Sequence, residues 1–168
     1  MLIKEKISNL RSFDIKHQNI SYVVIEWFET NKRILHKKTD SGIVITIKFL
    51  KENPEFKEGD VLWMDENMVI VIDIKACEAI VIRPATILEA AFICYEIGNK
   101  HLPLYYENED LLIPYEAPLH KLLQALGYTT KVEERKLTNA VKTSVSPHGD
   151  SGGSTSLFNK ILQLTTSS

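Results

Sequence analysis

The fold class is decided by the central stretch Cys77-Glu-Ala-Ile-Val-Ile-Arg83-Pro84-Ala85-Thr86-Ile87-Leu88-Glu89. Residues 77–83 are rich in β-branched side chains, which predicts a strand, and Pro84 limits its extension. Thr86 and Glu89 have the spacing of a capping box, in which each side chain satisfies a backbone N–H at a helix start. A strand followed closely by a helix is therefore expected here.

The elements that follow complete a recognisable order. Helical spacing of Leu88, Ala91, Phe92 and Tyr95 predicts one apolar stripe, with Gly98 ending the helix. Two short strands are expected around an acidic turn, then a helix from near Pro118 to Gly127, then a last strand; the predicted ranges are 102–106, 111–115, 118–127 and 129–135. The stripe of the second helix is Leu119, Leu122, Leu123 and Leu126. Strand, helix, strand, strand, helix, strand is the ferredoxin-like βαββαβ arrangement.

The first half contains short β-like runs and no convincing helix. Such runs, closely spaced by turns, predict a small all-β sandwich or barrel; they are residues 20–28, 42–49, 61–64 and 68–73. The sequence therefore predicts an α+β chain with three parts: a β-rich, peptide-binding-like domain at 1–75, a ferredoxin-like metal-binding and dimerisation domain at 76–147, and a flexible tail at 148–168.

The C-terminal part has a different composition. Residues 146–156 are rich in Gly, Ser and Pro, as flexible linkers are. Leu157-Phe-Asn-Lys-Ile-Leu-Gln-Leu164 is too short to be a stable helix alone. We expect this segment to be disordered in the free protein, and ordering on a partner is the alternative.

Charge and hydropathy exclude several classes of function. The 168 residues carry a net charge of −2, which provides no electrostatic footprint for nucleic acid or an anionic membrane. No apolar run approaches the ~20 residues of a spanning helix. The charged start, Met-Leu-Ile-Lys-Glu-Lys, does not resemble a signal peptide. A soluble, cytoplasmic protein is expected.

No catalytic motif is found. The sequence lacks GxSxG, HExxH, GxxxxGK[ST] and GxGxxG patterns. Glu133 and Glu134 are adjacent on a predicted strand and so face opposite ways, while the acidic turn 107–110 is interpreted as solvated. Asp150-Ser-Gly-Gly153 resembles a serine-protease sequence but stands in the tail. Cys77 and Cys94 are interpreted as small buried side chains. We expect no enzyme.

His101 is the informative residue. It follows Gly98-Asn99-Lys100 and precedes Leu102-Pro103, and Pro103 restricts the residue before it to extended geometry. A lone histidine is more often structural than a ligand, and one imidazole cannot satisfy a transition metal. A two-fold axis near His101 would bring the imidazoles of two chains together. Such an axis is a reasonable expectation because symmetric dimers are the commonest assembly. His148, in the tail, is a second candidate ligand for an open site.

Gly98-Asn99-Lys100-His101-Leu102-Pro103 resembles Gly-Asn-Arg-His-x-Pro, the hallmark of the urease accessory nickel metallochaperones of the UreE family. The resemblance covers roughly residues 1–148. It implies a non-enzymatic protein that delivers Ni(II) to apo-urease, with an N-terminal domain similar to a co-chaperone's peptide-binding subdomain. It also implies a homodimer formed through the second domain, with His101 of each chain at a shared nickel site; a dimer of dimers around one ion is the alternative assembly. The implied partners are the urease accessory GTPase UreG and the maturation complex.

The chain departs from the family pattern in several places. The tail has only His148 where many relatives are histidine-rich, so one shared ion is expected. His120 is interpreted as a surface helix residue, and His17 and His36 as surface residues of the β half. Lys100 keeps the positive charge of the hallmark arginine but not its planar fork. Zn(II) or Cu(II) binding in vitro is not excluded by ligand type. The alternative function is a peptide-binding adaptor of the maturation complex with an incidental metal site.

Overall fold

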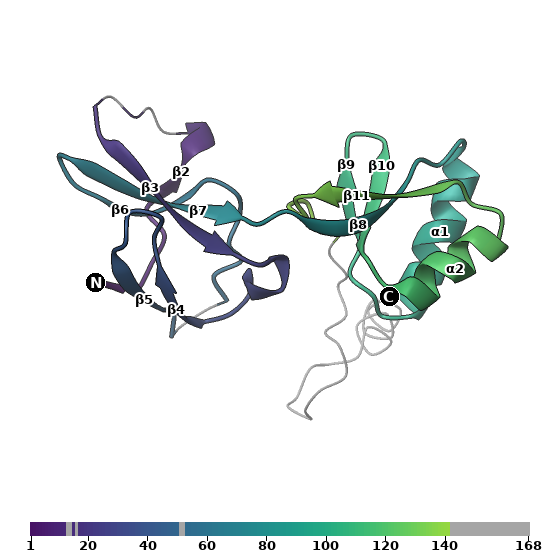
Figure 1. Ribbon diagram of the computed structural model, residues 1–168, viewed down its shortest axis with the longest axis horizontal. Helices are drawn as coiled ribbons and strands as arrows, with labels where there is room; N and C mark the ends of the chain where they lie inside the picture. The colour runs from purple at the N-terminus through teal and green to yellow at the C-terminus, as the bar shows by residue number, and fades with distance from the viewer. Residues whose placement is uncertain (13–14, 16, 51–52, 142–168) are drawn as a thin grey trace, which may run out of the picture.

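The computed structural model describes residues 1–141, apart from 13–14, 16 and 51–52 (Figure 1). An N-terminal domain of β-strands is followed by a domain in which two helices cover a sheet. The predicted flexible tail, including His148 and residues 157–164, lies outside the described residues. Within the described part, no helix combines the length and apolar character that crossing a membrane requires.

The N-terminal domain is built from two sheets. One has the order β1-β5-β4, with β1 at Leu2–Ile3, β5 at Val44–Lys48 and β4 at Ile34–Lys38. The other has the order β2-β6-β7-β3, with β2 at Ser8–Asn9, β6 at Asp60–Met64, β7 at Met68–Ile74 and β3 at Asn19–Ile25. Buried side chains of both sheets share one core, among them Ile45, Ile47, Val23, Ile25, Ile70 and Ile72. The predicted small all-β domain is confirmed, and of the two predicted forms, sandwich or barrel, it has the sandwich form.

Two details of this domain differ from the prediction. The strand expected over residues 20–28 ends at Ile25, and Trp27–Glu29 forms the 3₁₀-helix η2 instead. Glu29 causes the change, because its carboxylate accepts a hydrogen bond from the Glu26 backbone N–H (3.0 Å) and closes the turn. A second 3₁₀-helix, η1, lies at Leu10–Ser12. The turn η2 presents Trp27 to the second domain.

The second domain has the predicted element order. Its elements are β8 (Cys77–Ile82), α1 (Ile87–Asn99), β9 (Tyr105–Glu107), β10 (Asp110–Pro114), α2 (Ala117–Ala125) and β11 (Thr130–Arg135). The sheet is antiparallel with the order β11-β8-β10-β9, so β10 lies between the two strands that α1 connects. This is the split βαβ topology of a ferredoxin-like domain. Both helices lie on one face of the sheet (Figure 1).

Local signals in the sequence position both helix starts. Thr86 Oγ1 accepts a hydrogen bond from the Glu89 backbone N–H (3.1 Å), and the Glu89 carboxylate accepts one from the Ala85 backbone N–H (2.7 Å). The capping interaction is therefore confirmed, with its return bond one residue earlier than in the standard box. Pro118 lies in the first turn of α2, where its missing N–H is of no consequence.

The face of this sheet away from the helices meets the N-terminal domain. Ala79, Val81, Tyr105, Leu112 and Leu137 form a small buried cluster on that face, and Trp27 packs against it. The Trp27 and Tyr105 rings meet edge to face at 6.2 Å, and burial raises the pKa of Tyr105 to about 12. Lys136 pairs with Glu58 (2.7 Å) and Asp73 of the first domain. Apolar packing and ion pairs therefore join the two domains.

Candidate metal centre

His101 lies in the turn that ends α1, in a backbone conformation that side chains rarely adopt. The helix continues through Gly98 and ends at Asn99, so the prediction that Gly98 ends it is wrong. The His101 N–H donates to the Gly98 carbonyl (3.0 Å), and the Leu102 N–H donates to the Ile97 carbonyl (3.3 Å). These two bonds define a Schellman motif in which His101 has the left-handed position, with φ at +55°.

The second helix ends in the same motif, but with glycine at the left-handed position. The Gly127 N–H donates to the Gln124 carbonyl (3.0 Å) and the Tyr128 N–H donates to the Leu123 carbonyl (3.1 Å). Gly127 has φ at +87°. Glycine is usual there because a Cβ makes this conformation unfavourable by about 1–2 kcal/mol. One fold thus contains two equivalent turns, and the candidate ligand occupies the strained one.

The strain at His101 is not offset by contacts of its own side chain. His101 is exposed, and its imidazole has no hydrogen-bond or ion-pair partner within the part of the chain that the structure describes. Apolar packing holds the turn instead, because Ile97 and Leu102 belong to the core between the helices and the sheet. The histidine is therefore held by its backbone while its two ring nitrogens remain available.

The described residues of a single chain do not form a complete metal site. No group of three or more His, Cys, Asp or Glu side chains with metal-binding geometry occurs among the described residues. A transition metal usually takes four or more ligands, so a metal ion bound to His101 would need donors from outside the described residues of one chain.

The apolar stripe predicted on α1 does not face the core. The buried side of the helix is Ile93 and Ile97, with Cys94 packed beside them. The predicted stripe lies on the opposite side of the helix, where Leu88, Phe92 and Tyr95 are 56–67% exposed and Ala91 is exposed as well. Helical spacing did identify an apolar face, but α1 has two, and only the fold shows which one is covered. In α2 the predicted stripe is largely correct, with Leu119 and Leu123 buried and Leu126 exposed.

His148 lies outside the described residues, but the structure shows where the chain that carries it departs. Ala140 bridges Tyr105, and the Val141 N–H donates to the Leu104 carbonyl (2.8 Å). Leu104 is three residues from His101, and His148 is seven residues beyond Val141. Seven extended residues span about 24 Å. The fold therefore leaves His148 within reach of His101 of the same chain.

The other histidines have ordinary surroundings. His120 is half-buried rather than a free surface residue, because its Nε2 lies 2.9 Å from Thr130 Oγ1 and its ring meets Tyr115 edge to face. His36 is exposed and lies 3.1 Å from Thr46 Oγ1, and His17 is exposed. None of these three joins His101 in a cluster of the described residues.

The thiols and carboxylates of this domain do not complete a site either. Cys77 and Cys94 are half-buried, and burial raises the pKa of both thiols, which disfavours the thiolate that binds metals. The acidic turn is not merely solvated as predicted: Asp110 is buried and accepts a hydrogen bond from Arg83 Nε (2.7 Å). Arg135 pairs with Glu107 and Glu133. These three carboxylates are therefore paired with arginine side chains.

The described residues thus form a two-domain protein in which a β-sandwich is joined to a ferredoxin-like domain, and His101 at the end of α1 has no side-chain partner among them. Family profiles agree: "UreE urease accessory protein, N-terminal domain" matches residues 3–75, and the corresponding C-terminal domain matches residues 77–155. The chain belongs to the UreE family of urease accessory proteins, which implies a role in urease maturation.

Individual relatives support this assignment. The chain is 47% identical to a protein of Flavobacterium johnsoniae named urease accessory protein UreE, over 98% of this chain and 99% of the relative. Proteins of the same name in Helicobacter pylori and Acetivibrio thermocellus are 38% and 37% identical, over 89% and 82% of this chain and 91% and 90% of the relatives.

Proposed function

We propose that this protein is a nickel metallochaperone, which binds Ni(II) through His101 of two copies and delivers it to apo-urease without catalysing a reaction. The observation that carries the proposal is the exposed imidazole of His101, which has no partner among the described residues and is held in a strained turn at the end of an apolar helix face. A strained side chain with no structural contact of its own supports a functional role.

The exposed face of α1 supports the dimer that this proposal needs. Phe92 and Tyr95 lie in the last turns of the helix, directly before the turn that carries His101. Contiguous exposed apolar side chains of this size are typical of interaction surfaces. A two-fold axis near the C-terminal end of α1 would cover both side chains and bring two His101 imidazoles together. If two such dimers paired around one ion, the ratio would be one ion per four chains instead of one per two.

Imidazole donors in an incompletely enclosed site suit a metal ion that must be released again. Imidazole nitrogen is a suitable ligand for Ni(II), and also for Zn(II) and Cu(II), so selectivity would depend on geometry and metal supply. Two imidazoles leave coordination positions open for water, for His148 or for a ligand from a partner. We propose the GTPase UreG, within the urease maturation complex, as the partner that receives the metal.

Isothermal titration with Ni(II) tests the core of the proposal. The native protein should bind one ion per two chains, and His101→Ala should lower the affinity by at least about a hundredfold, since loss of an outer partner of a metal ligand already costs roughly 10–100-fold. His36→Ala, which removes another exposed histidine, should leave binding unchanged. Unchanged affinity in His101→Ala would rule out the proposed site.

His148 is tested by a point substitution that leaves the tail in place. If His148 donates to the same ion, His148→Ala should lower nickel affinity by less than His101→Ala and should reduce the number of imidazole ligands seen by X-ray absorption spectroscopy. The expected loss is smaller because the sequence predicts a flexible tail, and ordering such a segment on binding costs conformational entropy. An unaltered ligand count in His148→Ala would exclude this residue.

A peptide-binding adaptor with an incidental metal site is the second candidate. It is favoured by the row Ile20, Tyr22 and Val24, which lies on the edge strand β3 with each side chain more than a third exposed. A row of exposed apolar side chains is typical of an interaction surface, although a peptide that paired with the strand itself would have to replace the hydrogen bonds of the Tyr22 N–H and carbonyl to Asp40. This function predicts urease activation that survives His101→Ala, whereas the metallochaperone predicts its loss.

A further inference from the structure

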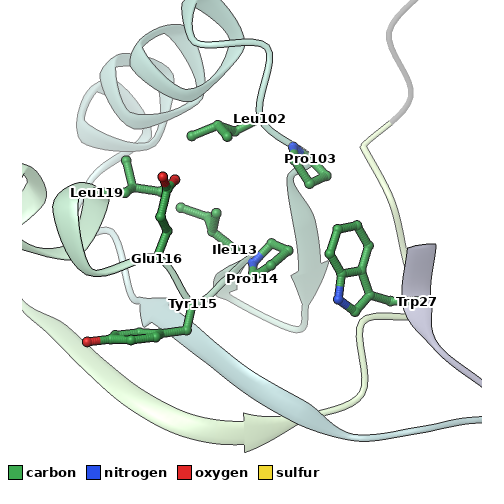
Figure 2. Close-up of a pocket in the computed structure, with 8 residues that line it drawn as sticks. All are labelled: Trp27, Leu102, Pro103, Ile113, Pro114, Tyr115, Glu116 and Leu119. Atoms are coloured by element: carbon green, nitrogen blue, oxygen red, sulfur yellow. The ribbon is translucent and has the colours of Figure 1, made fainter.

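A pocket of about 250 Å³ opens where the two domains meet (Figure 2). Its apolar lining comes from both domains, and consists of Trp27, Leu102, Pro103, Ile113, Pro114 and Leu119. Trp27 stands on one side, with Leu119 and the Glu116 side chain on the other. Leu102 and Pro103 directly follow His101, so this pocket borders the candidate metal centre without including it.

One unpaired charge stands at this apolar surface. Glu116 is exposed and precedes α2, but its side chain makes no capping hydrogen bond. No other hydrogen bond or ion pair of its carboxylate exists among the residues that the structure describes. The pocket therefore fits an occupant with apolar side chains and one positive charge. Its volume is below the roughly 300–1,000 Å³ of typical small-molecule sites, which favours a few side chains of a polypeptide.

The chain itself contains a segment with this composition. Leu157-Phe-Asn-Lys-Ile-Leu-Gln-Leu164, which lies outside the described residues, has five large apolar side chains and a single charge, Lys160. The segment also lies beyond the part of the chain that matches the family's C-terminal profile, which ends at residue 155. The family profiles therefore assign no role to this segment.

The fold brings this segment close to the pocket. The described chain departs at Val141, which is hydrogen-bonded to Leu104, the residue after Pro103 in the pocket wall. Fifteen residues, 142–156, separate Val141 from Leu157, and a Gly/Ser-rich chain of that length spans about 20 Å on average. The connection is long enough to reach the pocket and short enough to supply an effective concentration on the order of millimolar.

We propose that residues 157–164 dock into this pocket of the same chain, with apolar side chains against Trp27 and Lys160 beside Glu116. Docking would make residues 142–156, with His148, a loop held at both ends next to the turn of His101. The proposal concerns the metal-free protein and does not rest on nickel binding.

Trp27 fluorescence provides the test. The chain has two tryptophans, so Trp63→Phe leaves Trp27 as the only reporter. In metal-free buffer with chelator, the full-length Trp63→Phe protein should show a blue-shifted emission maximum and slower acrylamide quenching than the same protein truncated after Ser156. The difference should be independent of protein concentration. A peptide of residues 157–164 added to the truncated protein should restore the shift, with half-saturation below about 1 mM.

A charge exchange identifies the contact. Glu116→Lys should abolish the blue shift, and Glu116→Lys combined with Lys160→Glu should restore it. Glu66→Lys is the matched control, because Glu66 is an exposed carboxylate in the turn between β6 and β7, away from the pocket, and it should have no effect. Identical spectra of full-length and truncated protein would overturn the proposal. A shift that grows with protein concentration would overturn it too, since it would indicate docking on a second copy.

Discussion

Replacing His101 by glycine should remove nickel binding and at the same time make the metal-free protein more stable. The expected gain in the free energy of unfolding is about 1 kcal/mol, because glycine adopts the left-handed conformation of this turn without the cost that a Cβ imposes. For a chain of this length that corresponds to a rise in melting temperature of about 2–4 °C. No side-chain contact opposes the gain, because the exposed imidazole has no partner among the described residues.

Thermal denaturation in the presence of a chelator, together with nickel titration, separates the two effects. His101→Ala should lose nickel binding without the gain in stability, since alanine retains the strain. Gly127→Ala is the reciprocal control: the added Cβ would meet no atom within 4 Å, so the expected loss of about 1–2 kcal/mol reflects backbone conformation alone, and nickel binding should persist. A lower melting temperature for His101→Gly would mean that the imidazole stabilises the fold.

Replacing Phe92 by lysine should dissociate the proposed dimer and weaken nickel binding, although Phe92 offers no ligand atom. In a two-fold contact each substitution counts twice, and two ammonium groups would face each other where two aromatic rings had packed. We expect a loss of about 3 kcal/mol in association free energy, or roughly a hundredfold in the dimer dissociation constant. Nickel affinity falls with it, because each chain supplies only part of the site.

Sedimentation velocity over a range of concentrations, with and without Ni(II), measures the effect. Leu50→Lys places the same charge on another exposed apolar residue, in the N-terminal domain, and should leave both association and nickel binding unchanged. If Phe92→Lys remains a dimer with native affinity, the dimer uses another surface. If it becomes a monomer that still binds nickel with native affinity, the site does not require two copies.

Short-range interactions in the sequence determine much of the secondary structure of this protein. The Thr86–Glu89 cap, the position of Pro118 and the left-handed Gly127 in the turn after α2 are short-range effects, and each has its predicted place. The order of strands and helices follows from apolar periodicity, which is why the ferredoxin-like arrangement was predictable. The boundary of β3 was not, because the Glu26–Glu29 turn competes with the continuation of the strand.

The sequence was sufficient to predict the candidate residue, His101, but not the geometry of the turn that holds it. The motif around His101 is visible in the sequence, and its family is confirmed. That His101 rather than Gly98 has the left-handed conformation is a result of packing, because the Schellman motif needs Leu102 to fold back against Ile97 in the core. The availability of the imidazole follows from that backbone.

The sequence by itself determined the element order, the helix caps and the histidine to examine. Tertiary structure alone decided which face of α1 is covered, since the helix is apolar on two sides and the sheet can cover only one. It also decided that Trp27, from the N-terminal domain, meets residues 102–119 to form a pocket. Periodicity shows which faces of a helix or strand are apolar. Whether such a face is buried depends on which distant elements the fold places against it.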